Sequence, residues 1–247
     1  MSQSQDERQS VMAHLTALRK IIVFCAAAIA VAFFLIFYFA IDYLMTLILQ
    51  PITARGIEVI YTAMSEALMT KMKVALIAAI VGTSPLIFWQ IWAFIKPALY
   101  PNEKRTVQVL FFVTVLLFLV GVVFCYGAVY MLAVDFFLVS GENLAVPMLS
   151  IDKYVSFLFG FVVPFGLAFE LPVALYVTTR MGLTNYQMLA SKRKYVILAV
   201  AVIAAILTPP DVVSQVMLGI PILLLFEVAL LICRFVKPKG QEEPADA

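Results

Sequence analysis

Long apolar runs alternate with short polar segments along almost the whole chain. A helix that crosses about 30 Å of hydrocarbon needs about 20 consecutive apolar residues. Such runs predict six transmembrane helices, at residues 21–41, 74–95, 107–132, 154–177, 195–207 and 212–233. The fifth run has only 13 residues and ends at the turn Thr208-Pro-Pro-Asp211. We therefore expect helices five and six to form a short hairpin, because two prolines cannot extend a helix.

Composition supports this prediction of an all-α integral membrane protein. Hydrophobic residues make up 64% of the chain and charged residues 13%, whereas soluble domains are about 45–50% apolar and about 25% charged. We expect one six-span domain over residues 1–239, with a disordered cytoplasmic tail at 240–247. The three cysteines lie in apolar runs, and the single histidine precedes the first run. This set predicts no metal site, no disulfide and no catalytic residues. The acidic start with no small-residue cleavage site does not suggest a signal peptide.

The distribution of cations predicts the orientation. The N-terminus, residues 96–106, residues 178–194 and the C-terminal tail together hold 13 of the 17 Lys and Arg residues. Cytoplasmic segments carry the excess of Lys and Arg in membrane proteins. Both termini and the loop after the second run are therefore expected in the cytoplasm.

That loop, FIKPALYPNEKR at residues 94–105, places one carboxylate in a proline-rich basic segment. Glu103 follows a stiff apolar shelf formed by Phe94, Pro97, Ala98, Leu99 and Tyr100. Two interpretations are open. The two cations after Glu103 set the topology and Glu103 neutralises one of them, or Glu103 is presented to a cationic ligand, such as a basic peptide segment followed by an apolar one.

Glu170 lies inside the fourth run, with Gly166 and Ala174 one helical turn away on either side. An isolated charge there costs about 3 kcal/mol or more, so an intramembrane acid is a functional hypothesis. Its small neighbours leave room for water or another helix, and we expect Glu170 to face a water-accessible cavity. The alternative is a protonated or hydrogen-bonded structural residue. For Glu227 in the sixth run we expect structural pairing with Arg234 at i+7, or snorkelling.

Polar residues also gather at the turn of the hairpin: Thr208, Asp211, Ser214 and Gln215. They either hydrate the turn or hydrogen-bond a partner helix within the membrane. Pro51 and Asp42 belong to a long outer segment of mixed polarity, residues 42–73, for which a capping or packing role is the default.

Five strings give the chain a resemblance to a known family: FIKPALYPNEKR, FGLAFELPVAL, MGLTNYQMLASKRKYVIL, LTPPDVVSQ and GIPILLLFE. They resemble the TatC family, the multi-span core and signal-peptide receptor of the twin-arginine protein translocase. The resemblance extends from about residue 12 to residue 236. It implies a concave six-helix bundle in the bacterial inner membrane, without a cofactor. It also implies partners: Arg-Arg signal peptides, TatA-like and TatB-like single-span proteins and further copies in a multimeric complex, but no nucleic acid.

The resemblance assigns roles to single residues. Glu103 and Phe94 match positions of signal-peptide recognition, and Arg19, Pro97 and Leu99 lie in the same matching segments. Glu170 matches the family's intramembrane acid and Pro51 an outer-loop proline. The partner-docking patch corresponds to Thr208, Asp211 and Gln215. One position departs from the pattern, because Ala17 stands in HLTALR where the family has Glu, and this puts a second arginine contact in doubt.

The sequence thus predicts a receptor and assembly core that moves folded proteins across the membrane with the proton motive force, and no enzyme. One rival is a proton-coupled secondary transporter that uses Glu170 as a relay. The chain has no internal repeat, which weighs against the repeat-built transporter folds. A second rival, an intramembrane hydrolase, needs a base within the membrane, and the only histidine, His14, lies before the first run.

Overall fold

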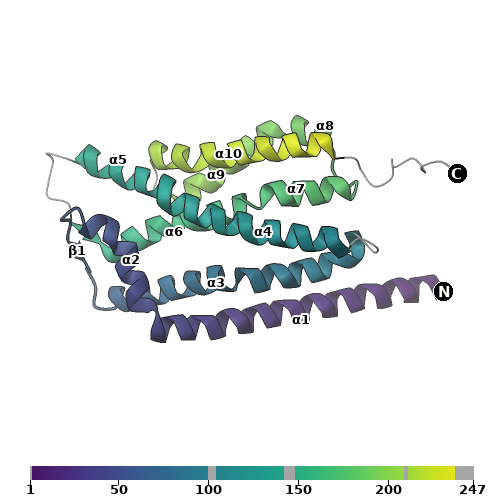
Figure 1. Ribbon diagram of the computed structural model, residues 1–247, viewed down its shortest axis with the longest axis horizontal. Helices are drawn as coiled ribbons and strands as arrows, with labels where there is room; N and C mark the ends of the chain where they lie inside the picture. The colour runs from purple at the N-terminus through teal and green to yellow at the C-terminus, as the bar shows by residue number, and fades with distance from the viewer. Residues whose placement is uncertain (1, 100–103, 142–147, 209–210, 237–247) are drawn as a thin grey trace. The chain divides into compact units, whose positions relative to one another are not determined.

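The computed structural model describes residues 2–99, 104–141, 148–208 and 211–236, and their side chains from residue 16 onward except at 95–106. Nearly all of these residues are helical (Figure 1). The elements in chain order are α1 (Ser2–Phe39), α2 (Ile41–Thr53), β1 (Val59–Ile60), α3 (Glu66–Leu99), α4 (Lys104–Phe124), the π-helical η1 (Cys125–Tyr130), α5 (Met131–Gly141), β2 (Leu149–Ser150), α6 (Ile151–Ala168), α7 (Leu171–Arg180), α8 (Tyr186–Ser191), α9 (Arg193–Leu207) and α10 (Val212–Phe235).

Five of the six expected spans coincide with helical segments that are long and apolar enough to cross a membrane. These are Thr16–Phe39, Glu66–Phe94, Val107–Gly141, Ile151–Arg180 and Val212–Phe235. The fifth expected span corresponds to α9, which has 15 residues. At a rise of 1.5 Å per residue it is about 22 Å long, against about 30 Å of hydrocarbon. The chain is a multi-pass membrane protein, and the crossing by α9 stays a prediction.

The segment 42–73 is more ordered than its mixed polarity suggested. It begins with α2, whose buried residues Ile41, Met45, Ile48 and Ile52 recur every three or four positions. This spacing places them on one helix face. Gly56, with φ of +74°, ends the helix in the left-handed region that glycine adopts without a Cβ clash.

The chain is mostly helical, as predicted, and a small parallel sheet that was not foreseen adds to the helices. Val59 and Ile60 of β1 pair with Leu149 and Ser150 of β2, respectively. The Glu66 carboxylate supports this pairing from the start of α3. It accepts hydrogen bonds from the backbone N–H groups of Thr62 (2.5 Å), Ala63 (3.2 Å) and Asp152 (3.2 Å), and from the hydroxyls of Thr62 (2.7 Å) and Ser150. One side chain therefore joins segments that are more than 80 residues apart in the sequence.

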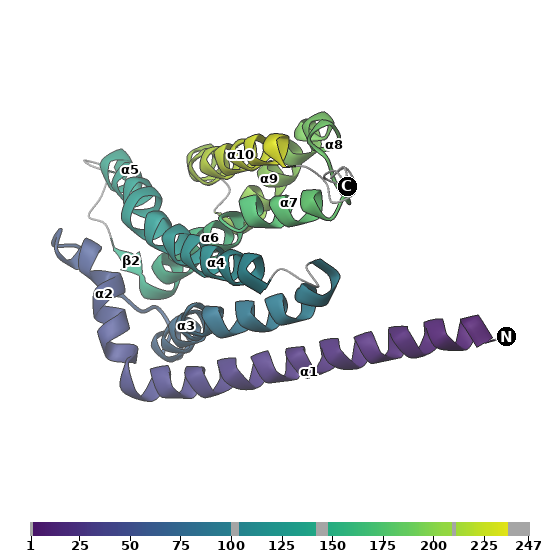
Figure 2. The same ribbon diagram turned by 45° about the vertical axis from the view of Figure 1, so that its right-hand side comes forward.

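Contacts divide the chain into two compact units, Met1–Thr46 with Lys71–Val115, and Leu47–Thr70 with Leu116–Ala247. In the first unit, the Lys71 ammonium lies 2.6 Å from the Asp42 carboxylate. The Trp92 indole N–H donates to the Thr114 hydroxyl at 3.2 Å, which ties α3 to α4. In the second unit α10 packs along both α7 and α9 (Figures 1 and 2).

Two glycines and two phenylalanines lock α4 against α6 within the second unit. A Cβ on Gly121 of α4 would lie 2.8 Å from Cγ and 2.9 Å from Cβ of Phe169, and a Cβ on Gly166 of α6 would lie 2.8 Å from Cε2 of Phe118. Each helix thus supplies a glycine gap and, three residues away, a ring that fills the gap of the other. Lipid is as apolar as a side chain, so close packing of this kind is what holds helices together in a membrane.

The close packing of α4 and α6 predicts how three glycine-to-alanine variants rank in stability. Gly121→Ala should lower the free energy of unfolding by about 1–3 kcal/mol, because the new methyl meets the stem of Phe169, which cannot swing aside. Gly166→Ala should cost less, because it meets the far edge of the Phe118 ring. Gly82→Ala is the control, since nothing lies within 4 Å of its new methyl. Thermal unfolding of the three purified variants in detergent measures the order. Equal stability of the Gly121 and Gly82 variants would contradict the lock.

Candidate functional site

The segment expected to bind a cationic peptide is largely the junction of two helices. The loop was expected to begin near residue 94, but α3 continues through Pro97 to Leu99, and α4 begins at Lys104. Phe94 is half-buried, and Arg19 on α1 is exposed. Glu103 lies outside the described residues, and so does the predicted tail at 240–247.

The fourth span is broken at Glu170. Helix α6 ends at Ala168, and α7 starts at Leu171 with Pro172 in its first turn. Proline has no N–H to donate to the carbonyl four residues earlier, which favours a break at this point. The Glu170 N–H instead donates to the Leu167 carbonyl at 3.1 Å. Glu170 itself is half-buried, and its Oε1 is shielded from solvent.

We expected open space on both sides of Glu170, and the structure fills one of the two sides. The gap left by Gly166 is filled by the Phe118 ring, as described above, so it is not free for water. On the other side Ala174 is exposed. The expectation that Glu170 faces a water-accessible cavity therefore rests on the side of Ala174 and stays a prediction.

The polar residues of the α9–α10 hairpin bond largely to the hairpin itself. Thr208 is 6% exposed, and its hydroxyl donates to the Ala204 carbonyl at 2.9 Å. Asp211 caps α10 by accepting from the N–H of Ser214 at 2.7 Å and from its hydroxyl. The Gln215 amide donates to the Ala201 carbonyl on α9 at 2.8 Å. These bonds fit a role in holding the turn, and they leave the Gln215 amide oxygen available to a partner.

A glycine also fixes the end of α9. A Cβ on Gly160 of α6 would lie 2.5 Å from the carbonyl oxygen of Leu207, so only glycine allows α6 to approach the backbone there. The short helix α9 is thereby seated against α6 at its last residue, next to Thr208. The position of the turn is set by backbone contact rather than by large side chains.

The expected partner of Glu227 was wrong. Arg234 is exposed, whereas the Arg193 guanidinium binds the Glu227 carboxylate with two bonds, Nε to Oε1 at 2.8 Å and Nη2 to Oε2 at 2.9 Å. Arg193 is the first residue of α9, so this pair closes the other end of the hairpin. Such bidentate geometry matches the fork of a guanidinium to the two oxygens of a carboxylate.

Pro51 lies inside α2 and has a specific structural consequence. Lacking an N–H, it leaves the carbonyl of Leu47, four residues earlier, without its helical donor. The Tyr126 hydroxyl donates to that carbonyl at 2.9 Å. On the next residue, Ile48, the carbonyl accepts from the Tyr154 hydroxyl at 3.0 Å.

The carbonyl of Pro51 is used as well. It accepts from Nη1 of Arg55 at 3.1 Å, and Nη2 of the same guanidinium lies 2.5 Å from the Asp135 carboxylate on α5. The default role foreseen for Pro51, packing and capping, therefore has a physical basis in these contacts.

Metal and thiol chemistry find no support in the described part of the chain. No group of three or more His, Cys, Asp or Glu residues is placed there to hold a metal ion. The three cysteines are free thiols, with Cys125 and Cys233 buried, as expected for small apolar residues in helices.

The long apolar helices define the class of protein, a multi-pass helical membrane protein. The family profile described as "Sec-independent protein translocase protein (TatC)" matches residues 13–221. The chain therefore belongs to the TatC family of protein translocase components, as the sequence motifs predicted.

Individual relatives agree over nearly their whole length. The TatC protein of Carboxydothermus hydrogenoformans is 40% identical over 236 residues, which cover 95% of this chain and 97% of the relative. TatC of Escherichia coli is 36% identical over 240 residues, 96% of this chain and 93% of the relative. A crystal structure described as "Twin Arginine Translocase Receptor- TatC" superposes with a TM-score of 0.83 at 38% identity, covering 90% of this chain and 98% of that one.

Sequence reasoning missed the side chains that bond to α2 and to Glu227. Pro51 indicates that the Leu47 carbonyl needs another donor, but nothing in the sequence points to Tyr126, 79 residues further along. Arg193 was counted only as one of the cytoplasmic cations. Its pairing with Glu227 follows from the meeting of the two ends of the hairpin.

Pro51 and Tyr126 should be energetically coupled. Tyr126→Phe should cost about 0.5–1.5 kcal/mol of stability, because it leaves the Leu47 carbonyl without a donor. In a Pro51→Ala background the cost should shrink, since the alanine N–H can bond that carbonyl. A double-mutant cycle on unfolding free energies in detergent measures this coupling.

Tyr154→Phe provides the control for that cycle. The Ile48 carbonyl also has the N–H of Ile52 in the same helix, so the cost of losing the Tyr154 hydroxyl should not depend on Pro51. A Tyr126 cost that is unchanged in the Pro51→Ala background would show that the proline does not create the need for this hydroxyl.

Proposed function

We propose that this protein is the receptor and assembly core of a twin-arginine translocase. In this proposal it binds Arg-Arg signal peptides at its cytoplasmic face, gathers TatA-like and TatB-like single-span partners, and moves folded proteins across the bacterial inner membrane with the proton motive force. The observation that carries the proposal is the likeness, over 90% of the chain, to a structure described as a twin arginine translocase receptor. Further copies of the chain join it in the complex.

The proposed orientation places both termini in the cytoplasm, which requires that α9 cross the membrane as the fifth of six spans. The charge pattern supports this crossing, because Lys192, Arg193 and Lys194 lie at one end of α9 and Thr208 at the other. The ammonium groups of Lys192 and Lys194 lie 5.2 Å and 5.3 Å from the ring centre of Tyr195. Aromatic and cationic side chains of this kind gather at membrane interfaces.

The proposed recognition depends on Glu103. Two N–H donors of a guanidinium match the two oxygens of a carboxylate, and an ammonium cannot bind in this way. The half-buried Phe94 at the end of α3, with Pro97 and Leu99, would receive the apolar residues that follow the arginines. Arg19 lies in the N-terminal segment of the same face. Since Ala17 cannot supply a second carboxylate, Glu103 carries more of the recognition in this chain.

Glu103→Gln should therefore abolish export of Arg-Arg substrates while the protein remains folded in the membrane. We expect a loss of about 2–5 kcal/mol of peptide affinity, because the signal-peptide arginine that is buried against Glu103 in the proposed complex loses its charged partner. Export of a reporter with an Arg-Arg signal measures the effect. Glu58→Gln is the matched control, since Glu58 is an exposed carboxylate in the segment between α2 and β1. Wild-type export by the Glu103 variant would refute this role.

The hairpin of α9 and α10 is proposed as the docking site of a single-span partner, through Thr208, Asp211 and Gln215. The seating of α9 on Gly160 supports this role, because a short, fixed hairpin keeps the polar groups at one depth in the membrane. The remaining acceptor of Gln215, its amide oxygen, is the group that a polar side chain of the partner would bind. Hydrogen bonds of this kind within membranes contribute about 0.6–2 kcal/mol.

Replacement of Gln215 by Leu should reduce co-purification of the single-span partner from mild detergent. The same substitution at Gln50, which is exposed on α2, should leave partner recovery unchanged. Because Gln215→Leu also removes the bond to Ala201, its melting temperature is measured beside the pull-down. Full partner recovery in a variant with a native-like melting temperature would exclude docking through Gln215.

A further inference from the structure

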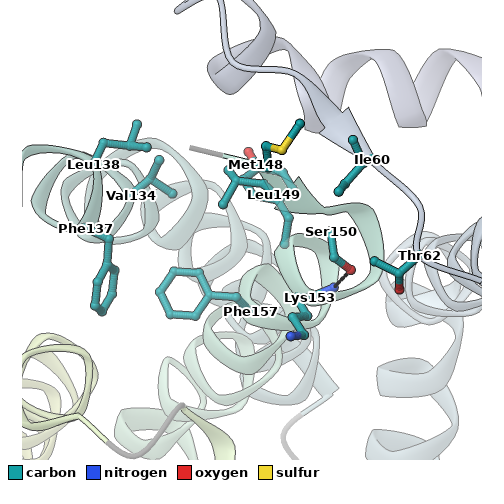
Figure 3. A pocket seen from close by; sticks show the side chains of 11 residues that line it. Ile60, Thr62, Val134, Phe137, Leu138, Met148, Leu149, Ser150, Lys153 and Phe157 are labelled. Carbon is teal, nitrogen blue, oxygen red and sulfur yellow. Dashed lines mark hydrogen bonds between the residues drawn. The ribbon is translucent and has the colours of Figure 1, made fainter. Parts of the chain in front are cut away.

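A cavity of about 420 Å³ lies where α5 ends and α6 begins, beside the small sheet (Figure 3). Its lining comes from three parts of the chain: β1 and the residues after it, α5, and β2 with the start of α6. The lining residues include Val134, Phe137, Leu138, Ser150, Lys153 and Phe157. Cavities of about 300–1,000 Å³ are typical of sites for small molecules.

The cavity has a polar edge at Lys153 and an apolar wall that begins one helical turn further along α6, at Phe157. Val134, Phe137 and Leu138 share one face of α5 and turn toward the cavity. Phe157 faces them from α6, and its ring meets that of Phe137 edge to face at 5.7 Å between centroids (Figure 3). Lys153 lies four residues before Phe157, on the same face of α6 and nearer to the helix start.

Lys153 is the one charged residue among those that line the cavity. Its side chain is exposed, and none of the hydrogen bonds or ion pairs between described residues involves its ammonium. A lysine at the end of a span keeps its charge at the membrane interface while its stem lies along apolar surface. The cavity therefore combines an available cation at its edge with aromatic rings inside.

Three of the described acids near this edge are already engaged. Both Glu66 oxygens accept hydrogen bonds from the residues around Thr62 and Ser150, as described for the sheet. Asp135 lies 2.5 Å from the guanidinium of Arg55. An Asp152 oxygen lies 3.5 Å from the Thr70 hydroxyl. Among the described residues that line the cavity, the charge that remains to be matched is the positive one of Lys153.

We propose that this cavity binds one anionic glycerophospholipid from the adjoining leaflet. The phosphate pairs with the Lys153 ammonium, and an acyl chain lies against Phe137 and Phe157. The occupant is a lipid because the cavity opens at the end of two membrane spans, where the bilayer supplies amphiphiles at high local concentration. The Lys153 ammonium attracts the phosphate of such a headgroup, because opposite charges interact more strongly near a protein surface than in bulk water. This site is independent of the proposed signal-peptide and partner sites.

Lipid titration of the purified, delipidated protein, followed by native mass spectrometry, tests the proposal. Dioleoylphosphatidylglycerol should bind with a stoichiometry of one at low concentration. Dioleoylglycerol, which has the same chains without phosphate, and glycerol 3-phosphate, which has no chains, should each bind much more weakly. Equal binding of dioleoylglycerol and the phospholipid would overturn the role of Lys153.

Two pairs of variants localise the binding. Lys153→Gln should weaken phosphatidylglycerol binding about tenfold, the effect of losing about 1.4 kcal/mol, whereas Lys71→Gln, at a lysine outside the cavity, should not. Leu138→Trp should fill the cavity and remove the bound lipid, whereas Val139→Trp, at a neighbouring position that is 68% exposed, should not.

Circular dichroism and the elution volume identify variants that have unfolded, and Leu138→Phe then replaces Leu138→Trp as the filling variant. Phosphatidylglycerol binding that survives both Lys153→Gln and a folded filling variant would overturn the site. Loss of a dimer mass in the filling variant, with lipid binding unchanged, would instead assign the cavity to a second copy of the chain and would also overturn the lipid proposal.

Discussion

A proline inside a helix leaves the carbonyl four residues earlier without its helical donor, and another group has to supply the hydrogen bond. Pro51 creates this need at Leu47, and the Tyr126 hydroxyl meets it from a helix far along the chain. A hydrogen bond of this kind contributes about 0.5–1.5 kcal/mol of net stability. The Tyr126 hydroxyl of η1 and the Tyr154 hydroxyl of α6 bond neighbouring carbonyls of α2, and these bonds join three elements of the second compact unit.

Close approach is the other means by which this unit holds its shape. Lipid gives helices no hydrophobic reason to associate, so glycine gaps that admit a ring or a carbonyl matter more here than in a soluble core. Gly121 admits the ring of Phe169, the residue before the break at Glu170, and Gly166 admits the ring of Phe118, so that α4 and α6 approach each other closely. Gly160 seats the last residue of α9. The break at Glu170 and the α9–α10 hairpin are thus held in place by close approach at glycines. Such contacts suit the polar groups at these two places, which must stay at a defined depth in the membrane.

The spans could be predicted from the sequence because length and apolarity decide them, as in Val212–Phe235. The hydrogen-bond and ion-pair partners of single side chains could not be predicted, because they depend on which helix ends lie close together in the fold. Glu227 has Arg234 at a plausible helical spacing, yet it binds Arg193 through the hairpin. The helix α2 was missed because its 13 residues are too few for a span, and the sheet was missed because strands of two residues leave no periodic signal. The sequence places Thr208, Asp211 and Gln215 together at one turn, but the hydrogen bonds that these side chains make follow only from the folded turn.

The proposed binding site for paired arginines, which follows from membership of the TatC family, lies near the end of α3. A photo-crosslinking amino acid at Phe94, with a labelled signal peptide, tests this central claim most directly. The account predicts crosslinks to an Arg-Arg peptide and far fewer to a Lys-Lys peptide, since an ammonium cannot make the two-pronged contact. A probe at Tyr61, which is exposed in the segment after β1, should give no crosslinks above background. Equal yields with both peptides at position 94, or equal yields at positions 94 and 61, would contradict the account.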